Sequence, residues 1–181
     1  MAILAVMATF DPAAPESRQA AVPKQAGLTF NVARRVASLA TRYHRATIRG
    51  LEHIPRQGPA LIVANHGIFG FDTPVFFSLI YEATGRMPIG LAERLLVRLK
   101  PMRAVLQEIG GVEGTRENAL SLLRQGQLVV CYPGGAREVF KGRGERHRLA
   151  WKKALGFARV ACLTGAPVIP VAAIGVDDTF R

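Results

Sequence analysis

The sequence predicts an α/β fold, a single layered domain in which a largely parallel or mixed sheet is flanked by helices. Short apolar runs that fit buried strands alternate along the chain with longer stretches of helical periodicity. Several predicted strands end in glycine-bearing loops, and open α/β sheets gather such loops at one edge. At 181 residues, the chain is long enough to bury a substantial core.

The composition is that of a globular protein with a strong positive charge. Apolar residues make up 49% and charged residues 20%, and the net charge is +11. This charge predicts an anionic partner: nucleic acid, an anionic membrane surface or a phosphorylated substrate. No apolar run reaches the roughly eighteen residues of a transmembrane helix. Cys131 and Cys162 lie in apolar runs without metal-ligand spacing, which indicates buried thiols in a reducing compartment and no metal site.

The first 27 residues are predicted to be a mobile leader ahead of a domain over residues 28–181. Residues 1–10 are apolar but lack the basic start of a secretory signal, so we interpret them as a frayed end or a weak interfacial anchor. Residues 28–44 favour an amphipathic basic helix, which either contacts anionic lipid headgroups or packs on the sheet with a solvated basic side. Residues 46–51 alternate and predict a first strand.

An apolar run over residues 60–64 predicts a strand that is covered on both faces and stops abruptly at residues 65–67. Thr73 then fits a helix N-cap with Pro74 at the first helical position, and an apolar helix is expected to extend to residue 83. A strand that ends in a loop leading to a helix N-terminus is where open α/β sheets commonly place their chemistry.

His66 and Asp72 are the candidate catalytic pair in this loop. A histidine that acts as a general base needs one ring nitrogen free for the substrate proton and the other held by an acceptor, which a carboxylate supplies. On a continuous helix, side chains six positions apart are rotated by about 120° and cannot meet, so the glycines between them must bend the segment. The alternative is a satisfied half-buried histidine beside a helix-capping aspartate.

The rest of the chain continues the alternation of strands and helices. Pro101 is expected to break or kink a basic amphipathic stretch, and Thr115 is a credible helix N-cap. In order, the predicted elements are a strand over residues 87–92, the amphipathic stretch over 93–105, a glycine-rich edge over 110–114, a helix over 116–124, a central strand over 127–132, a helix over 149–163 and a last core strand over 168–174.

Pro133, Gly134 and Gly135 follow the predicted central strand. Two adjacent glycines allow backbone N–H groups to point at an anion or an oxyanion. Residues 137–153 then carry seven Lys and Arg residues against two glutamates, one of them Glu138. We interpret this stretch as a mobile phosphate-binding loop, with a solvated charge run as the alternative.

Four of these segments together resemble the glycerolipid acyltransferase superfamily, the lysophosphatidic-acid-acyltransferase-like proteins, and most closely its diacylglycerol-acyltransferase-like branch. The resemblance implies that His66 is the base that removes the acceptor hydroxyl proton and that Asp72 holds it. Arg116 and Arg137 occupy positions where the family binds phosphate or another polar head. The segments are residues 65–72, 111–119, 132–138 and 167–171, in family order.

By the same resemblance, the chain is expected to be an O-acyltransferase that moves a fatty acyl group from an acyl thioester, on coenzyme A or acyl carrier protein, to the hydroxyl of a glycerolipid or other lipid alcohol. It implies no further cofactor and no metal, and a peripheral position on the cytoplasmic side of an anionic membrane. The residues expected to bind substrate, besides the two arginines, are Asn65, Gly67, Pro133, Gly134, Gly135 and Glu138.

Two departures from the family pattern bear on the acceptor. Five residues separate His66 from Asp72, where the commonest family form has four, and this spacing resembles the neutral-lipid branch. Gly134 stands where the third motif usually carries an acidic residue, which argues against lysophosphatidate as acceptor. Relatives usually continue beyond the position of Arg181, so residues missing after it would be expected to complete the acceptor site.

The alternative to an enzyme is a non-catalytic basic protein on the same fold that binds lipid or nucleic acid. Nucleic acid is the less favoured partner, because the sequence offers neither a recognition helix nor an aromatic stacking platform and the motif loops have no role in such binding.

Overall fold

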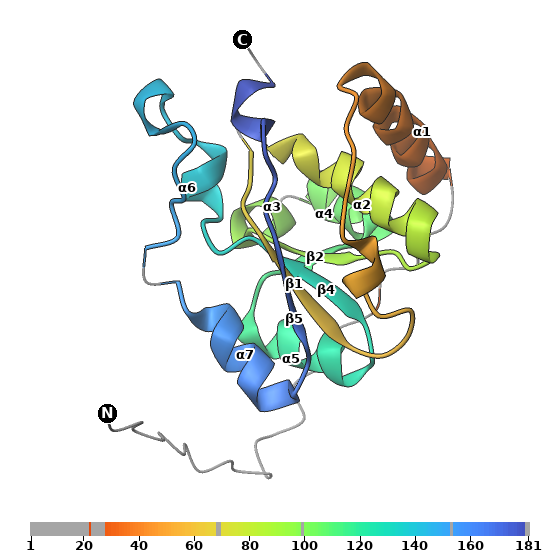
Figure 1. Cartoon of the computed structure of the whole chain (residues 1–181). Coiled ribbons are helices and arrows are strands. Elements are labelled where there is room, and N and C mark those ends of the chain that lie inside the picture. The colour runs from red at the N-terminus through yellow and green to blue at the C-terminus, as the bar shows by residue number, and fades with distance from the viewer. Residues whose placement is uncertain (1–21, 23–27, 68–69, 99, 153, 180–181) are drawn as a thin grey trace.

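The computed structural model describes residues 22, 28–67, 70–98, 100–152 and 154–179 as five strands in one sheet with helices on both sides (Figure 1). Every pairing in the sheet is parallel, which confirms the predicted α/β class with a largely parallel sheet. The predicted leader lies outside the described residues except for Val22. In sheet order the strands are β3 (Gly111–Glu113), β2 (Ile89–Ala92), β4 (Leu128–Cys131), β1 (Ala60–Ala64) and β5 (Val168–Val171).

The helices cover the two faces of the sheet unequally. One face packs on α5 and α7, and the other packs on α2, with α1 lying outside α2 and against α4. The α-helices are α1 (Leu28–Tyr43), α2 (Asp72–Thr84), α3 (Arg94–Arg98), α4 (Lys100–Ile109), α5 (Arg116–Arg124), α6 (Ala136–Val139) and α7 (Gly156–Thr164). Short 3-10 turns are η1 (Leu51–His53), η3 (Arg143–Glu145) and η4 (Val176–Asp178).

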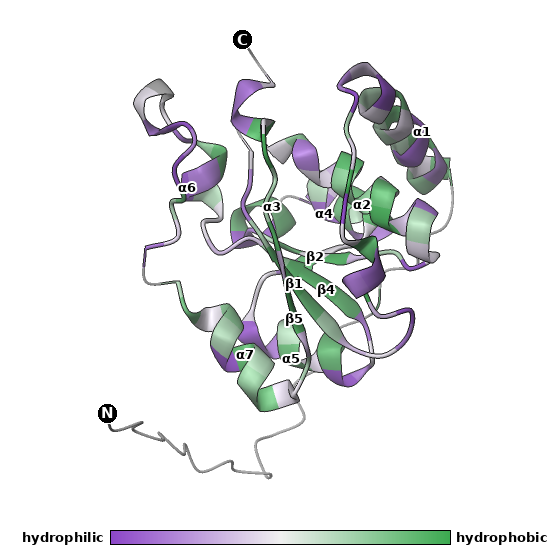
Figure 2. Cartoon of the chain, in the orientation of Figure 1, coloured by the Kyte–Doolittle hydropathy of each residue, from purple (hydrophilic) through white to green (hydrophobic). Residues whose placement is uncertain are grey.

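Strand β1 is the centre of the core, and Figure 2 shows the apolar strands enclosed by helices of mixed polarity. Leu61 and Val63 pack toward α5 and α7, whereas Ala60 and Ile62 pack toward α2. Burying an aliphatic side chain of this size contributes about 1.5–3 kcal/mol. Backbone pairing with β4 on one edge and β5 on the other sets the register of β1 and thereby the place where the chain leaves the sheet.

Three predicted elements differ from the structure. The last strand, predicted as a core strand over residues 168–174, ends at Val171 and lies partly exposed at the edge of the sheet. Residues 46–50 form no strand and lead into η1. Ile48 and Leu51 still pack on the core cluster below α2, but the segment lies outside the sheet and pairs with no strand in the described part of the chain. The helix predicted over residues 149–163 begins only with α7, because the chain turns through left-handed backbone at Lys152, where φ is 49°.

The helix ends follow the predictions in part. Thr115 caps α5 as predicted, and its hydroxyl accepts the Asn118 N–H at 3.1 Å. Thr73 does not cap α2, which begins earlier at Asp72 behind Phe71; its hydroxyl donates instead to the Tyr132 hydroxyl at 3.2 Å. The Thr73 side chain therefore joins the first turn of α2 to the end of β4.

The parallel sheet brings the loops after β1, β3 and β4 to one edge, as the sequence predicted. The carboxyl ends of parallel strands meet at the same edge, and β4 lies directly beside β1. All three glycine-bearing segments singled out in the sequence consequently share the carboxyl edge of the sheet.

Candidate active site

His66 and Asp72 meet in the loop that links β1 to α2. The His66 Nδ1 atom lies 3.0 Å from Oδ1 and 3.2 Å from Oδ2 of Asp72, and the two side chains are 13% and 11% exposed. The Gly67 N–H donates to Asp72 Oδ1 at 3.1 Å and fixes the carboxylate from the other side. The structure thus brings together the pair that the sequence proposed, through the bend that the glycines were expected to allow.

Gly67 and Gly70, the two glycines of this bend, lie in close contact with side chains around the site. A Cβ on Gly67 would lie 2.8 Å from Val176 Cβ and 3.1 Å from Asp72 Oδ1. A Cβ on Gly70, where φ is 72°, would lie 3.1 Å from Cε1 and 3.3 Å from Nε2 of His66. Since Nε2 has no hydrogen-bond partner among the residues the structure describes, Gly70 leaves open space beside the one ring nitrogen that is not held.

Tyr132 supports the imidazole from below, a role that the sequence reasoning missed. Its ring stacks on the His66 ring with centroids 4.0 Å apart and planes 12° from parallel. Burial, and then the negative charge of Asp72, raise the pKa of Tyr132, so its hydroxyl stays a neutral phenol. The signal that could have found it is its place at the end of the central strand, next to Pro133.

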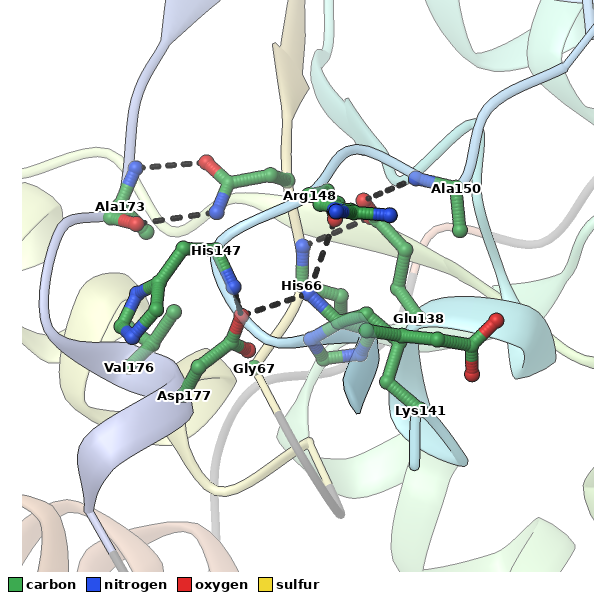
Figure 3. Close-up of polar contacts among 12 residues, drawn as sticks. His66, Gly67, Glu138, Lys141, His147, Arg148, Ala150, Ala173, Val176 and Asp177 are labelled. Carbon is green, nitrogen blue, oxygen red and sulfur yellow. Dashed lines mark hydrogen bonds and ion pairs between the residues drawn. The ribbon is translucent and has the colours of Figure 1, made fainter. Parts of the chain in front are cut away.

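Glu138 of α6 lies beneath the same loop and is fully buried (Figure 3). Its Oε2 accepts the backbone N–H of His66 at 2.9 Å, and its Oε1 accepts the N–H of Ala150 at 3.3 Å. Both oxygens of this residue, which the sequence assigned to substrate binding, are therefore engaged inside the protein.

Asn65 joins the end of β1 to the segment after β5. Its side chain donates to the Ala173 carbonyl at 2.9 Å and accepts the Ala173 N–H at 2.7 Å (Figure 3). Both the nitrogen and the oxygen of this amide hold the backbone of Ala173. Substrate binding by Asn65 would therefore have to occur alongside these two hydrogen bonds.

The Pro133-Gly134-Gly135 turn leaves β4 at the same edge. Gly135 has φ 49° and ψ −136°, and its N–H donates to the Tyr132 carbonyl at 2.9 Å. Of the two glycine amides considered as oxyanion donors, this one is already used. Glu93, which follows β2, brings its carboxylate to the same turn: a Cβ on Gly135 would lie 3.9 Å from Glu93 Oε2.

A cavity of about 320 Å³ opens between α5, α7 and the sheet. It reaches the carboxyl edge at Cys131 and Pro133, the two neighbours of Tyr132, but lies on the face opposite α2 and His66. Its lining comprises Leu61, Leu91, Gly114, Thr115, Arg116, Ala119, Cys131, Pro133, Ala154, Gly156, Phe157, Arg159 and Val160.

The cationic side chains expected to bind phosphate differ in their exposure and in their ion pairs. Arg116 and Arg137 are exposed and form no ion pair within the described part of the chain, and Arg116 lines the cavity. Lys141 is instead buried against Asp177, with Nζ 2.8 Å from Oδ2, which also accepts the His147 N–H at 2.8 Å (Figure 3). Burial alone would raise the pKa of Asp177, but these hydrogen bonds and the lysine charge outweigh it and lower that pKa. Lys141 is thus unavailable to a phosphate.

The cysteines fit the prediction in part. Cys131 is buried, and burial raises the pKa of its thiol to about 12. Cys162 is exposed, contrary to the prediction, because it lies on the outer side of α7. The described residues contain no group of three or more His, Cys, Asp and Glu side chains that could hold a metal ion. They also contain no helix long and apolar enough to span a membrane.

Comparisons with known proteins identify relatives of this chain. The human "DGAT1/2-independent enzyme synthesizing storage lipids" is 31% identical over 139 residues, which are 77% of this chain and 43% of that protein. The Arabidopsis thaliana "Phytyl ester synthase 2, chloroplastic" is 34% identical over an alignment of 150 positions that covers 77% of this chain and 21% of that protein. The chain spans less than half the length of these curated relatives, and no solved structure matches it.

The model of the family described as Acyltransferase matches residues 45–174, which contain all five strands and every residue of the proposed site. Residues 45–174 cover most of the chain, and the relatives agree with the match. The chain therefore belongs to the acyltransferase family, within the glycerolipid acyltransferase superfamily.

Proposed function

We propose that the protein is an O-acyltransferase that moves a fatty acyl group from an acyl thioester to the hydroxyl of a lipid alcohol. The observation that carries this proposal is the contact of His66 Nδ1 with the Asp72 carboxylate, at 3.0 Å, at the carboxyl edge of the sheet. With Nδ1 held in this way, Nε2 is the ring nitrogen that can take a proton.

In the proposed reaction, His66 Nε2 removes the proton of the alcohol while the hydroxyl oxygen attacks the thioester carbonyl. The tetrahedral intermediate then collapses, the C–S bond breaks, and the leaving thiolate takes the proton back from the imidazolium. Asp72 stabilises that imidazolium between the two steps. General-base catalysis of this kind is worth about 10²–10⁴-fold. The buried Cys131 thiol takes no part, because burial keeps it protonated.

The donor is proposed to be acyl-CoA or acyl carrier protein. A cavity of about 320 Å³ falls in the size range of small-molecule pockets and is suited to an acyl chain. Arg116, which lines this cavity and has no ion-pair partner among the described residues, can meet a phosphate of either carrier. The chain of the donor then lies on one face of the sheet and the base on the other, with the thioester at the edge between them.

The acceptor is proposed to be a neutral lipid alcohol. The names of the human and plant relatives refer to storage lipids and to phytyl esters. In this chain, the place of the usual acidic residue of the third motif is Gly134, which leaves room only for the stem of Glu138. A diacylglycerol or a long-chain alcohol fits these features better than lysophosphatidate.

We also propose that the protein lies on an anionic membrane surface, on its cytoplasmic side. Phe30 and Ala37 turn the inner face of α1 toward the core. The opposite face carries an outer stripe of exposed apolar side chains along the whole helix, and exposed Arg35 and Arg42 lie beside it. An apolar stripe flanked by basic side chains suits the boundary between headgroups and acyl chains. The outer stripe consists of Leu28, Val32, Val36, Leu39 and Tyr43.

The proposal is tested by incubating the protein with an acyl thioester and a panel of lipid alcohols and measuring new esters by mass spectrometry. We expect His66→Gln to lower kcat by about 10²–10⁴-fold and Asp72→Asn to lower it by at least about 10²-fold. Cys162→Ala is the control that keeps transfer activity, because this exposed cysteine does not line the cavity. A folded His66→Gln variant that transfers acyl groups at the wild-type rate would overturn the proposal and favour a lipid- or nucleic-acid-binding protein.

A further inference from the structure

We infer that Glu138 is a positioning residue of the base: its buried carboxylate holds the backbone of His66 in place, and it does not contact substrate. This inference rests on the proposed acyl transfer by His66 and assigns the role of a third side chain in the same site. It replaces the expectation from sequence that Glu138 contacts substrate.

The first observation is where the carboxyl group lies. Glu138 is 0% exposed, and the described residues place no Lys, Arg or His within ion-pair distance of it. Burying a carboxylate without a cation costs several kcal/mol, whereas an apolar side chain of the same volume would fill the space without that cost. A buried carboxylate that costs stability is expected where the fold or the site requires a hydrogen-bond acceptor that an apolar side chain cannot supply.

The second observation is what the two oxygens hold. Oε2 accepts the His66 N–H at 2.9 Å and Oε1 accepts the Ala150 N–H at 3.3 Å, so both act as acceptors, as a carboxylate does (Figure 3). His66 is then fixed three times: by Glu138 at its amide, by Asp72 at Nδ1 and by Tyr132 under its ring. Of these three contacts, the one with Glu138 is the contact to the His66 backbone, from which the ring extends.

The third observation is the close approach of the Glu138 stem to Gly134. A Cβ at position 134 would meet the Cγ and Cδ atoms of Glu138, so the space over this glycine is filled by the glutamate. Gly134 and Glu138 are therefore one unit: the glycine lets the side chain pass under the turn and reach His66. Position 134 has no acidic side chain of its own, but the carboxyl group of Glu138, from α6, lies next to it.

The loop that carries Ala150 is anchored independently of Glu138. Lys141 pairs with Asp177 at 2.8 Å, and the same carboxylate accepts the His147 N–H at 2.8 Å. Val176, next to that aspartate, lies against Gly67. Glu138 therefore connects His66 to a segment that is already tied to the body of the protein, which makes the connection rigid.

Two substitutions separate positioning from stability. Glu138→Gln keeps the shape but turns one N–H group toward a backbone N–H, so we expect kcat to fall by about 10-fold or more while KM for the thioester and the alcohol stays within about threefold. Glu138→Met removes the buried carboxylate at similar volume but leaves the His66 and Ala150 N–H groups without this acceptor, so we expect kcat of the folded variant to fall at least as far as in Glu138→Gln. Glu145→Gln is the matched control and should leave kcat unchanged, because this glutamate of the same loop is exposed and the one partner it has among the described residues is the Gly142 N–H.

The outcomes are distinct. Wild-type kcat in either folded Glu138 variant, or a rise in KM with kcat unchanged, overturns the positioning role, and the second result would assign Glu138 to substrate binding. If His66→Gln is inactive at the same time, the proposed function stands and only this inference fails. Amide hydrogen exchange of the wild-type protein gives a test that needs no variant: the His66 N–H should be protected by about 10³-fold or more, and fast exchange overturns the inference.

Discussion

Three glycines shape the space around His66, the proposed base, and each lies against a different side chain. Gly67 lies against Asp72, Gly70 against the His66 ring, and Gly134 against Glu138. The sequence identified Gly67 and Gly70 as places where the chain can bend, and Gly134 as a residue whose backbone N–H could point at an anion or an oxyanion. The structure adds that a methyl group at any of the three would contact the side chains that hold or form the site.

The first prediction concerns the open side of His66. In Gly70→Ala, the added methyl group would lie 3.3 Å from His66 Nε2. It would therefore occupy part of the space through which the hydroxyl of the lipid alcohol must approach this nitrogen. We expect kcat/KM for the lipid alcohol to fall by about 10-fold or more, measured as ester formation at saturating thioester.

Gly85→Ala is the control for this substitution. Gly85 has φ 70°, close to the 72° of Gly70, but nothing lies within 4 Å of its Cβ position. Both variants therefore carry the same backbone strain of about 1 kcal/mol, and only one narrows the site. Equal losses of activity in the two variants would contradict the prediction.

At the scale of elements, the end of β4 separates two compartments. Tyr132 points toward α2 and stacks on His66, whereas its neighbours Cys131 and Pro133 line the cavity between α5 and α7. This alternation is the ordinary period of a strand. A substrate that reacts at the edge can thus extend an acyl chain along one face while the base works from the other.

The second prediction tests whether the cavity holds the acyl chain. Gly156 lines it, with nothing within 4 Å of its Cβ position. We expect Gly156→Leu to lower kcat/KM for long acyl thioesters by about tenfold relative to short ones, because the added side chain occupies part of the cavity. The measurement is a competition between thioesters of different length.

Gly144→Leu serves as the control, because Gly144 also has free space at its Cβ position but does not line the cavity. An unchanged order of chain-length preference in Gly156→Leu would show that the acyl chain binds elsewhere.

At the scale of the whole molecule, net charge and the outer stripe of α1 point to the same partner. The chain carries a net charge of +11, and the outer stripe includes Leu39 at 67% and Val36 at 60% exposure. The sequence left open whether this helix contacts lipid or packs on the domain. In the structure its inner face packs and its outer face is exposed, so the two alternatives are compatible.

The third prediction is membrane binding through the outer stripe. We expect the protein to bind vesicles containing anionic lipid, with weaker binding at high salt because the charges are screened. A Val36→Asp/Leu39→Asp variant should lose binding by about 10-fold or more and keep its activity on micellar substrate, as sedimentation and ester formation would show.

Leu163→Asp on α7, an exposed leucine away from the outer stripe, should leave vesicle binding unchanged. Equal binding by wild type and the α1 variant would contradict the prediction. Preferential binding to DNA or RNA over anionic vesicles in the same titration would contradict it as well.

Local patterns predicted much of this fold. The apolar run of β1, the Thr115 cap and the His66 loop depend on residues close in sequence, and they appear where expected. The strand over residues 46–51 failed because pairing depends on a neighbour that the local pattern does not reveal.

The parts of the site that could not be predicted are contacts between distant segments. The stack of Tyr132 on His66, the bond from His66 to Glu138 and the burial of Lys141 against Asp177 arise only when β4, α6 and η4 close on the β1 loop. A run of basic residues looks the same in sequence whether each one faces water or an aspartate 36 positions away.

The hydrogen bonds between Asn65 and Ala173 mean that the site can be completed only after Ala173 has been synthesised. The two residues are 108 positions apart, and Val176 packs against Gly67 just beyond. A nascent chain that has released β1, α2 and β4 from the ribosome still lacks the segment that secures the histidine loop. The imidazole can therefore acquire its final surroundings only after the segment that follows β5 has left the ribosome.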